Sequence, residues 1–129
     1  MDKLQAYNTF WNGFIEPMIG ADDKWKAYEE ASVPSNAVLP YITYESASDD
    51  FGSSLALTAS LWDRSSAWTT VIAKLKQVET EISRGGKMVA YDGGAFWIRK
   101  AQPWAQRMTD ETDSSVKRIV LNLVVEFID

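Results

Sequence analysis

A strict alternation of hydrophobic residues near the end of the chain constrains the fold more than any other feature. Over residues 116–128 the alternating side chains form an apolar face and a mixed face: Ile119, Leu121, Leu123, Val125 and Phe127 on the first, and Arg118, Val120, Asn122, Val124 and Glu126 on the second. Successive side chains of a β-strand point to opposite faces, so this pattern predicts a long strand. An uninterrupted apolar face predicts a central position in a sheet rather than a solvated edge.

Four further segments are expected to build the sheet around this strand. Residues 41–46 and 54–63 show strand-like alternation and are joined by a turn. Residues 87–91 and 95–100 are expected to form a hairpin. Its two loop residues are expected to be Gly93-Gly94, because tight hairpin turns need positive φ angles.

Two segments have the period of amphipathic helices. The first spans residues 3–16 and is expected to end before Pro17, whose ring disfavours a helical conformation in the preceding residue. The second spans residues 66–83, and Gly85 suits the left-handed residue that often follows a helix. Residues 24–30 are expected to make a short helical turn.

The resulting order is α-β-β-α-β-β-β in one domain that spans residues 1–129. The expected fold class is α/β, of the α+β kind: an antiparallel sheet of four to five strands with two helices packed on one face. Two helices can cover only one face of such a sheet. The other face is expected to present Ala56, Trp62, Trp97, Val120 and Val124 and to contact another subunit. The alternative is that these are ordinary scattered surface residues.

The composition argues against enzyme activity. The chain has no histidine and no cysteine, which removes the common zinc sites and the nucleophile pairs that depend on histidine. Its paired glycines lack the spacing and the strand-to-helix setting of phosphate-binding loops. We expect no catalytic residues, no metal and no cofactor. A small enzyme that uses Asp, Glu or Lys is the alternative from another functional class.

Charge and hydropathy limit the partners. The net charge of −5 argues against nucleic-acid binding, although basic residues interleave with Trp97 and Trp104 in a way that can support base stacking. No apolar run approaches the roughly 20 residues of a membrane span, and the start of the chain does not resemble a signal peptide. We therefore expect a protein without membrane or nucleic-acid partners.

Residues 102–115 follow no regular period, and long aperiodic loops in compact domains are often functional. The segment contains Gln102, Trp104, Arg107 and Met108. Aromatic and methionine side chains suit protein interfaces, and charges can set the register of a contact, so the segment is expected to be a docking loop. The alternative is that Trp104 and Met108 pack on the protein's own sheet.

The acidic residues of interest lie in two turn-like segments: Asp49 and Asp50 beside Phe51, and Asp110, Glu111 and Asp113. The second group lacks the glycine and the later glutamate of a calcium loop, so a solvated turn is expected and not a metal site. Adjacent carboxylates point apart on an extended segment, which argues against acid–base catalysis by the first pair. Both segments are candidate contact regions.

Four stretches carry a resemblance to a known family. They read VPSNAVLPYITYE, LWDRSSAW, GGKMVAYDGGAFWIRKAQPWAQRMTDETD and RIVLNLVVEFI, and they fall in order within residues 30–129. Together they resemble the small tail-terminator proteins, also called minor tail or tail-completion proteins, of long-tailed phages and prophages. The pieces PYITY and PWAQRMTDETD are the most distinctive, and neither is a catalytic signature.

The resemblance implies a homo-oligomeric ring, commonly a hexamer, that caps the tail tube and presents the surface that joins the head. It therefore implies the tail tube protein and a head–tail connector or neck protein as partners. It also implies a place in the virion at the head–tail junction after assembly in the host cytoplasm. A head-completion or neck connector protein is the alternative. The contacts are expected from residues 49–53 and 102–113, with Trp62 and Trp97.

Overall fold

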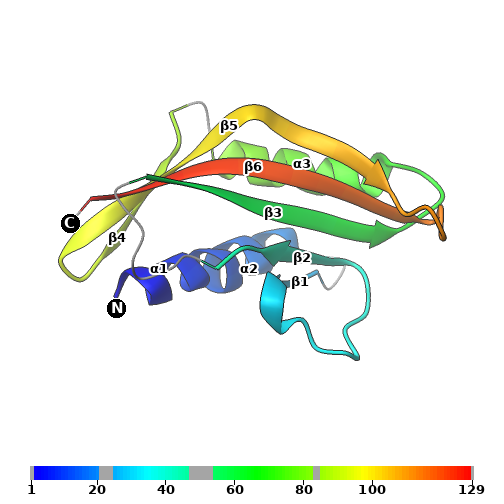
Figure 1. Ribbon diagram of the computed structural model, residues 1–129, viewed down its shortest axis with the longest axis horizontal. Coiled ribbons are helices and arrows are strands. Elements are labelled where there is room, and N and C mark those ends of the chain that lie inside the picture. The colour runs from blue at the N-terminus through cyan, green and yellow to red at the C-terminus, as the bar shows by residue number, and fades with distance from the viewer. Residues whose placement is uncertain (1, 21–24, 47–53, 83–84, 129) are drawn as a thin grey trace.

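The computed structural model describes residues 2–20, 25–46, 54–82 and 85–128. These residues form a curved six-stranded sheet with the helices on one side of it (Figure 1). The spatial order of the strands is β1-β2-β3-β6-β5-β4, and their bounds are β1 Lys26–Glu29, β2 Tyr41–Tyr44, β3 Ser54–Arg64, β4 Lys87–Tyr91, β5 Gly94–Thr109 and β6 Val116–Ile128. Strands β1 and β2 pair in parallel, and every other neighbouring pair is antiparallel.

Strand β6 lies in the centre of the sheet, between β3 and β5, which confirms the prediction from its alternating pattern. Its five apolar residues are all buried, and each pairs in register with an apolar residue of β3 or β5. Burying one such side chain contributes about 1.5–3 kcal/mol to folding. Strand β6 contributes five residues to the hydrophobic core, more than any other strand of the described chain.

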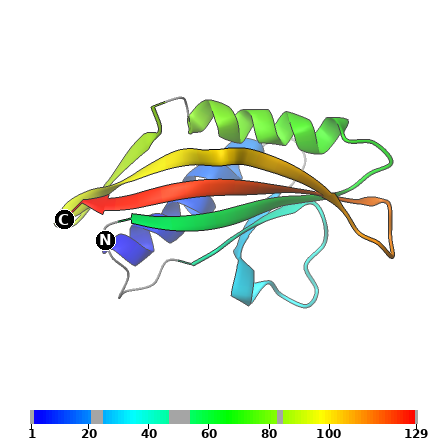
Figure 2. The same cartoon turned by 45° about the horizontal axis from the view of Figure 1, so that its top comes forward.

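The helices pack on the same face of the sheet, as Figures 1 and 2 both show. The N-terminal helical segment has three parts: α1 Lys3–Thr9, the π-helix η1 Phe10–Ile15 and α2 Glu16–Ile19. Helix α3 spans Thr69–Glu81, and a short 3₁₀ helix, η2, spans Glu30–Ser32. The expected arrangement of two helices on one face is thus the one observed.

A group of aromatic rings holds the N-terminal helix to the sheet. Trp11 stacks on Tyr44 of β2, with ring centroids 5.7 Å apart and planes 11° from parallel. Tyr7 meets Phe96 of β5 edge-on at 5.7 Å. The ammonium group of Lys74 in α3, although the helical pattern places it toward solvent, is buried and donates to the carbonyl of Ile19 at 2.6 Å. That hydrogen bond joins the two helices.

The N-terminal helix does not end before Pro17, so that prediction was wrong. In the π-helix the backbone N–H of Glu16 donates to the carbonyl of Trp11, five residues earlier. Pro17 falls in the first turn of α2, where a residue without an N–H group is tolerated. The wider π-helical turn thus carries the helix past a proline.

Residues 26–29 form strand β1, not the helical turn that was expected. The segment pairs with β2, and the N–H of Ala27 donates to the side chain of Glu16 at 2.9 Å. Tertiary pairing overrides the weak local helical pattern, as is common for short segments. The order becomes α-β-β-β-α-β-β-β, and the sheet is mixed and six-stranded where four or five antiparallel strands were expected.

The hairpin loop is Asp92-Gly93 and not Gly93-Gly94. Tyr91 pairs with Gly94, so Gly94 is already the first residue of β5, and only Gly93 has a positive φ, of 91°. An Asp-Gly pair is a preferred sequence for two-residue hairpin turns. At the preceding bend, Gly86 has a φ of 81°, whereas the sequence favoured Gly85 for the left-handed position.

Replacing Gly86 by alanine is expected to destabilise the protein by about 2–3 kcal/mol, because the left-handed backbone disfavours a side chain. A Cβ atom there would also lie 2.5 Å from the indole nitrogen of Trp97 and 2.6 Å from the carbonyl of Ile98. Gly85→Ala is the matched control, since its Cβ meets no atom within 4 Å. Urea denaturation of both variants measures the effect. Equal stabilities of the two variants would contradict this account of the bend.

Candidate functional site: the outer face of the sheet

The outer face of the sheet, which is turned away from the helices, is not covered by any element of the described chain (Figure 1). All the side chains that the sequence predicted for this face do lie on it. Trp62, Trp97, Val120 and Val124 are partly exposed and Ala56 is exposed. They belong to β3, β5 and β6, and Ala56 pairs with Val124 across the first and last of these strands. This face is the candidate interaction surface.

A row of large side chains crosses the outer face from β1 to β5, and we call it the aromatic row: Tyr28, Tyr41, Trp62, Arg118 and Met108. The ring centroids of Tyr28 and Tyr41 lie 5.6 Å apart, and those of Tyr41 and Trp62 lie 6.4 Å apart. The guanidinium carbon of Arg118 lies 4.4 Å from the ring centroid of Trp62. Met108 pairs directly with Arg118.

The strand register and hydrogen bonds fix the centre of the aromatic row. Trp62 pairs with Tyr41 on one side and with Arg118 on the other, so the three side chains stand next to one another. The indole N–H of Trp62 donates to the hydroxyl of Thr43 at 3.0 Å. The Nε–H of Arg118 donates to the hydroxyl of Ser60 at 3.2 Å. The row is therefore held in place before any partner binds.

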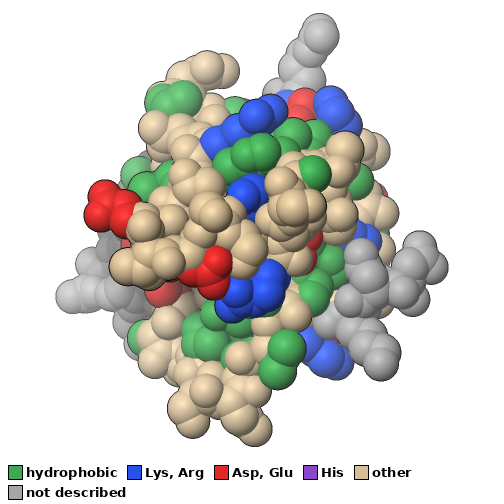
Figure 3. Space-filling view, turned by 90° about the vertical axis from the view of Figure 1, so that its right-hand side faces the viewer, with side chains coloured by type: hydrophobic (Ala, Val, Ile, Leu, Met, Phe, Trp, Pro, Cys, Tyr) green, Lys and Arg blue, Asp and Glu red, His purple; other side chains and the backbone are tan. Residues whose placement is uncertain are grey.

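A small hollow of about 150 Å³ opens at one end of the aromatic row. It is lined by Trp62, Met108, Thr109, Asp110, Val116 and Arg118. The hollow lies toward the end of the molecule where β5 turns into β6, and Figure 3 views the molecule from that end, with basic and hydrophobic side chains side by side. A guanidinium group beside apolar walls suits a carboxylate ligand or an amphipathic side chain better than it suits catalysis.

Trp97, the other aromatic residue predicted for this face, has an internal role. Its indole N–H donates to the carbonyl of Gly85 at 2.8 Å, which ties the hairpin to the bend before β4. The guanidinium of Arg99 lies 4.1 Å from the ring of Trp97 and 3.5 Å from the carboxylate of Glu126. The charges of Arg99 and Glu126 therefore balance each other within the chain, so this part of the outer face is occupied by internal contacts.

The predicted docking loop is mostly strand. Strand β5 continues to Thr109, with an irregularity in which residues 101–104 face the single residue Asn122. The peptide bond before Pro103 is cis, and the side-chain amide of Asn122 donates to the carbonyl of Pro103 at 3.0 Å. This bulge breaks the alternation of side chains, which is why the sequence pattern gave no sign of a strand here.

The side chains of that segment point to different sides. Trp104 packs against the hydrophobic core, and its indole N–H is buried without a hydrogen-bond partner in the described residues. The guanidinium of Arg107 lies 5.3 Å from the ring of Trp68, at the start of α3. Met108 is 48% exposed on the outer face, and Gln102 is exposed in the bulge. The structure thus separates Trp104 from Met108, which the sequence grouped together.

The acidic residues after β5 shape a turn. The carboxylate of Asp110 accepts from the N–H and the hydroxyl of Thr112 at 2.8 and 2.7 Å, and these bonds lower its pKa. Asp113 accepts from the hydroxyl of Ser115 at 2.6 Å and from Arg64 at 2.5 Å. The hydroxyl bond first, and then the guanidinium, lower the pKa of Asp113 to about 2. Glu111 is exposed.

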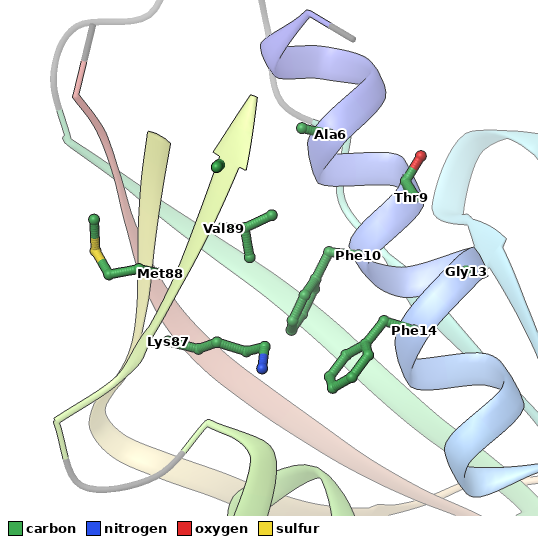
Figure 4. Close-up of a pocket in the computed structure, with 9 residues that line it drawn as sticks. Ala6, Thr9, Phe10, Gly13, Phe14, Lys87, Met88 and Val89 are labelled. Atoms are coloured by element: carbon green, nitrogen blue, oxygen red, sulfur yellow. The ribbon is translucent and has the colours of Figure 1, made fainter. Parts of the chain in front are cut away.

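A second apolar surface lies between the N-terminal helix and β4, where a groove of about 440 Å³ opens (Figure 4). Phe10 and Phe14 of the π-helix form one wall, and Lys87 and Val89 of β4 point toward them from the other. Phe14 is 38% exposed and Met88, at the rim, is 55% exposed. The sequence pattern did not reveal this surface, because Phe14 falls within the apolar stripe of the helix.

The groove offers little for chemistry. Among the described residues that line it, only Lys87 is titratable. Its ammonium group lies 4.4 Å from the ring centroid of Phe14 and 3.8 Å from the carboxylate of Glu81. Among the residues that the structure describes, no three potential metal ligands of the His, Cys, Asp or Glu types come together. None of the helices in the described ranges is long and apolar enough to cross a membrane. Asp49, Asp50 and Phe51 lie outside the described residues.

Comparison with known proteins gives a fold relative. No protein-family model and no curated protein sequence matches the chain. A chain in a solved structure described as the virion of a native gene transfer agent particle matches with a TM-score of 0.64. The match covers 96% of this chain and 92% of that chain at 16% sequence identity. The two chains therefore share a fold over almost their whole length.

Trp104→Ala and Met108→Ala are expected to differ in stability. Trp104 packs against the core, so its truncation is expected to cost about 2–3 kcal/mol, whereas Met108 is half exposed and its truncation is expected to cost less than about 1 kcal/mol. Chemical denaturation of the two variants tests the assignment. A larger loss for Met108→Ala would show that the faces of β5 are assigned wrongly.

Asp113 is expected to make stability depend on acidic pH. Its pKa is lower in the folded protein than its ordinary value of 3.8, so its contribution is complete above about pH 4 and is lost as the pH falls toward 2. The stability difference between wild type and Asp113→Asn should therefore shrink over that range. Denaturation at a series of pH values measures it, with Glu111→Gln in the same turn as the control. A difference that stays constant down to pH 2 would refute the shift.

Proposed function

We propose that this chain is a structural protein of a phage-like virion and, within that class, a tail terminator. In this role several copies, expected to be six, form a ring that caps the tail tube and presents the surface that joins the tail to the head. The observation that carries the proposal is the shared fold with a chain from a gene transfer agent virion, over 96% of one chain and 92% of the other. The resemblance of four sequence stretches to tail terminators supports the narrower assignment.

The open face of the sheet supports a role in assembly. The helices cover the inner face (Figure 1), while the outer face carries the aromatic row together with Trp97, Val120 and Val124. A ring needs two different surfaces on each subunit that fit each other head to tail. The outer face is the proposed first surface. Trp62 and Met108 are the proposed contact residues on it, and the turn with Asp110, Glu111 and Asp113 borders it.

The chemistry of the surfaces supports a structural role without catalysis. The groove beside the π-helix holds one lysine and no acid–base pair, and the acidic turn uses two of its carboxylates in its own hydrogen bonds. We propose that the protein needs no cofactor and that its partners are further copies of itself, the tail tube protein and a neck protein. The proposed location is the head–tail junction of the virion.

Light scattering and negative-stain microscopy of the purified protein test this function. The expected result is a ring of identical subunits at high concentration, which binds purified tail tubes. A protein that stays monomeric up to millimolar concentration contradicts the ring. Rings that bind purified head connectors but not tail tubes would instead identify a neck protein.

A further inference from the structure

Arg118 differs from the other charged residues on the outer face because its charge is not balanced within the described chain. Arg99 pairs with Glu126 at 3.5 Å, and Arg64 pairs with Asp113 at 2.5 Å. No carboxylate of the described residues lies within salt-bridge distance of Arg118. Asp110 lines the same hollow, but its carboxylate accepts from Thr112 and forms no salt bridge with Arg118.

The guanidinium of Arg118 is nevertheless held in a fixed position. Its central carbon lies 4.4 Å from the centroid of the Trp62 ring, and its Nε–H group donates to Ser60, whose side chain is buried. These contacts leave the two terminal nitrogens for an external ligand. A planar guanidinium offers such nitrogens as a fork that matches the two oxygens of a carboxylate. Met108 and Val116 line the hollow beside Arg118, and apolar neighbours of this kind strengthen the electrostatic attraction by lowering the local dielectric constant.

We propose that Arg118, with Trp62 and Met108, binds a carboxylate side chain from a second copy of this chain. The proposal rests on the proposed function, because it identifies a contact by which neighbouring subunits associate. Charge complementarity favours a second copy as the occupant. The chain contains 18 acidic and 13 basic residues, so each copy has carboxylates in excess. Exposed acidic residues such as Glu30, in the short helix η2, and Glu111, in the turn after β5, are accessible to a neighbour.

Arg118→Gln is the direct test, because it removes the charge and keeps a polar side chain of similar reach. The apparent dissociation constant for assembly, measured by light scattering over a concentration series, is expected to rise about tenfold or more. Arg118→Lys keeps the charge but loses the fork and the stacking on Trp62, so an intermediate effect is expected. Lys76→Gln, which removes one charge from the exposed side of α3, is the matched control and should assemble like wild type.

Salt dependence separates an ionic contact from a general structural role. Assembly of the wild type should weaken as sodium chloride rises, and this dependence should be smaller for Arg118→Gln. Folded fractions are measured by circular dichroism, so that assembly is compared at equal amounts of folded protein. If Arg118→Gln destabilises the fold, Arg118→Lys is used instead, and the expected result is an affinity for assembly that is lower than that of wild type while the salt dependence is retained.

The outcomes distinguish this inference from the proposed function. Assembly of folded Arg118→Gln with the affinity and salt dependence of wild type would overturn the inference while leaving the ring intact. Normal rings of this variant that no longer bind tail tubes would show that the carboxylate belongs to another protein, which also overturns it. A wild-type protein that remains monomeric overturns both.

Discussion

The whole structure depends on the burial of one face of β6. The strand runs through the middle of the sheet, and its inner residues pack against β3, β5 and the helices. Because strand side chains alternate, the same backbone that buries Ile119, Leu121 and Leu123 must present Arg118, Val120 and Asn122 on the opposite side. The helices occupy only the inner side, so the outer side is left to solvent or to another molecule. The fold itself thus creates the surface on which the proposed function depends.

That outer surface is organised rather than merely exposed. The register of β2, β3, β6 and β5 lines up Tyr41, Trp62, Arg118 and Met108 across four strands. Hydrogen bonds from Trp62 to Thr43 and from Arg118 to Ser60 fix two of these side chains. Ordering side chains in advance reduces the entropy that a partner's binding would cost. A subunit that must join identical neighbours in one fixed geometry benefits from this preorganisation.

The sequence predicted the elements that contain a long run of regularly spaced apolar residues. Strand β6 and helix α3 were found because each has a regular apolar pattern of ten or more residues. Strand β1 and the bulge in β5 were missed, because each depends on a contact with a distant part of the chain. For example, the side chain of Glu16 accepts from the N–H of Ala27, and the side-chain amide of Asn122 donates to the carbonyl of Pro103 in the bulge. No local pattern contains these pairings. The helix past Pro17 was missed because a proline at that position ordinarily ends a helix.

The candidate site was predictable to the same extent. Trp62 lies on the outer face as the sequence predicted, and Met108 is exposed there too, but Trp104 packs against the core, since the bulge changes which face each residue of β5 occupies. Arg118 was missed because an arginine on the polar side of a strand is ordinary until its neighbours are known. Only the pairing of β3 with β6 shows that the guanidinium of Arg118 lies against the ring of Trp62.

The central claim is that copies of the chain associate through the outer face of the sheet. Hydroxyl-radical footprinting tests it most directly, because tryptophan and methionine side chains on both candidate surfaces react readily when exposed. The account predicts that oxidation of Trp62 and Met108 falls on going from dilute to assembled protein, while Met88 beside the groove stays reactive. Unchanged oxidation of Trp62 and Met108, with protection of Met88, would contradict it.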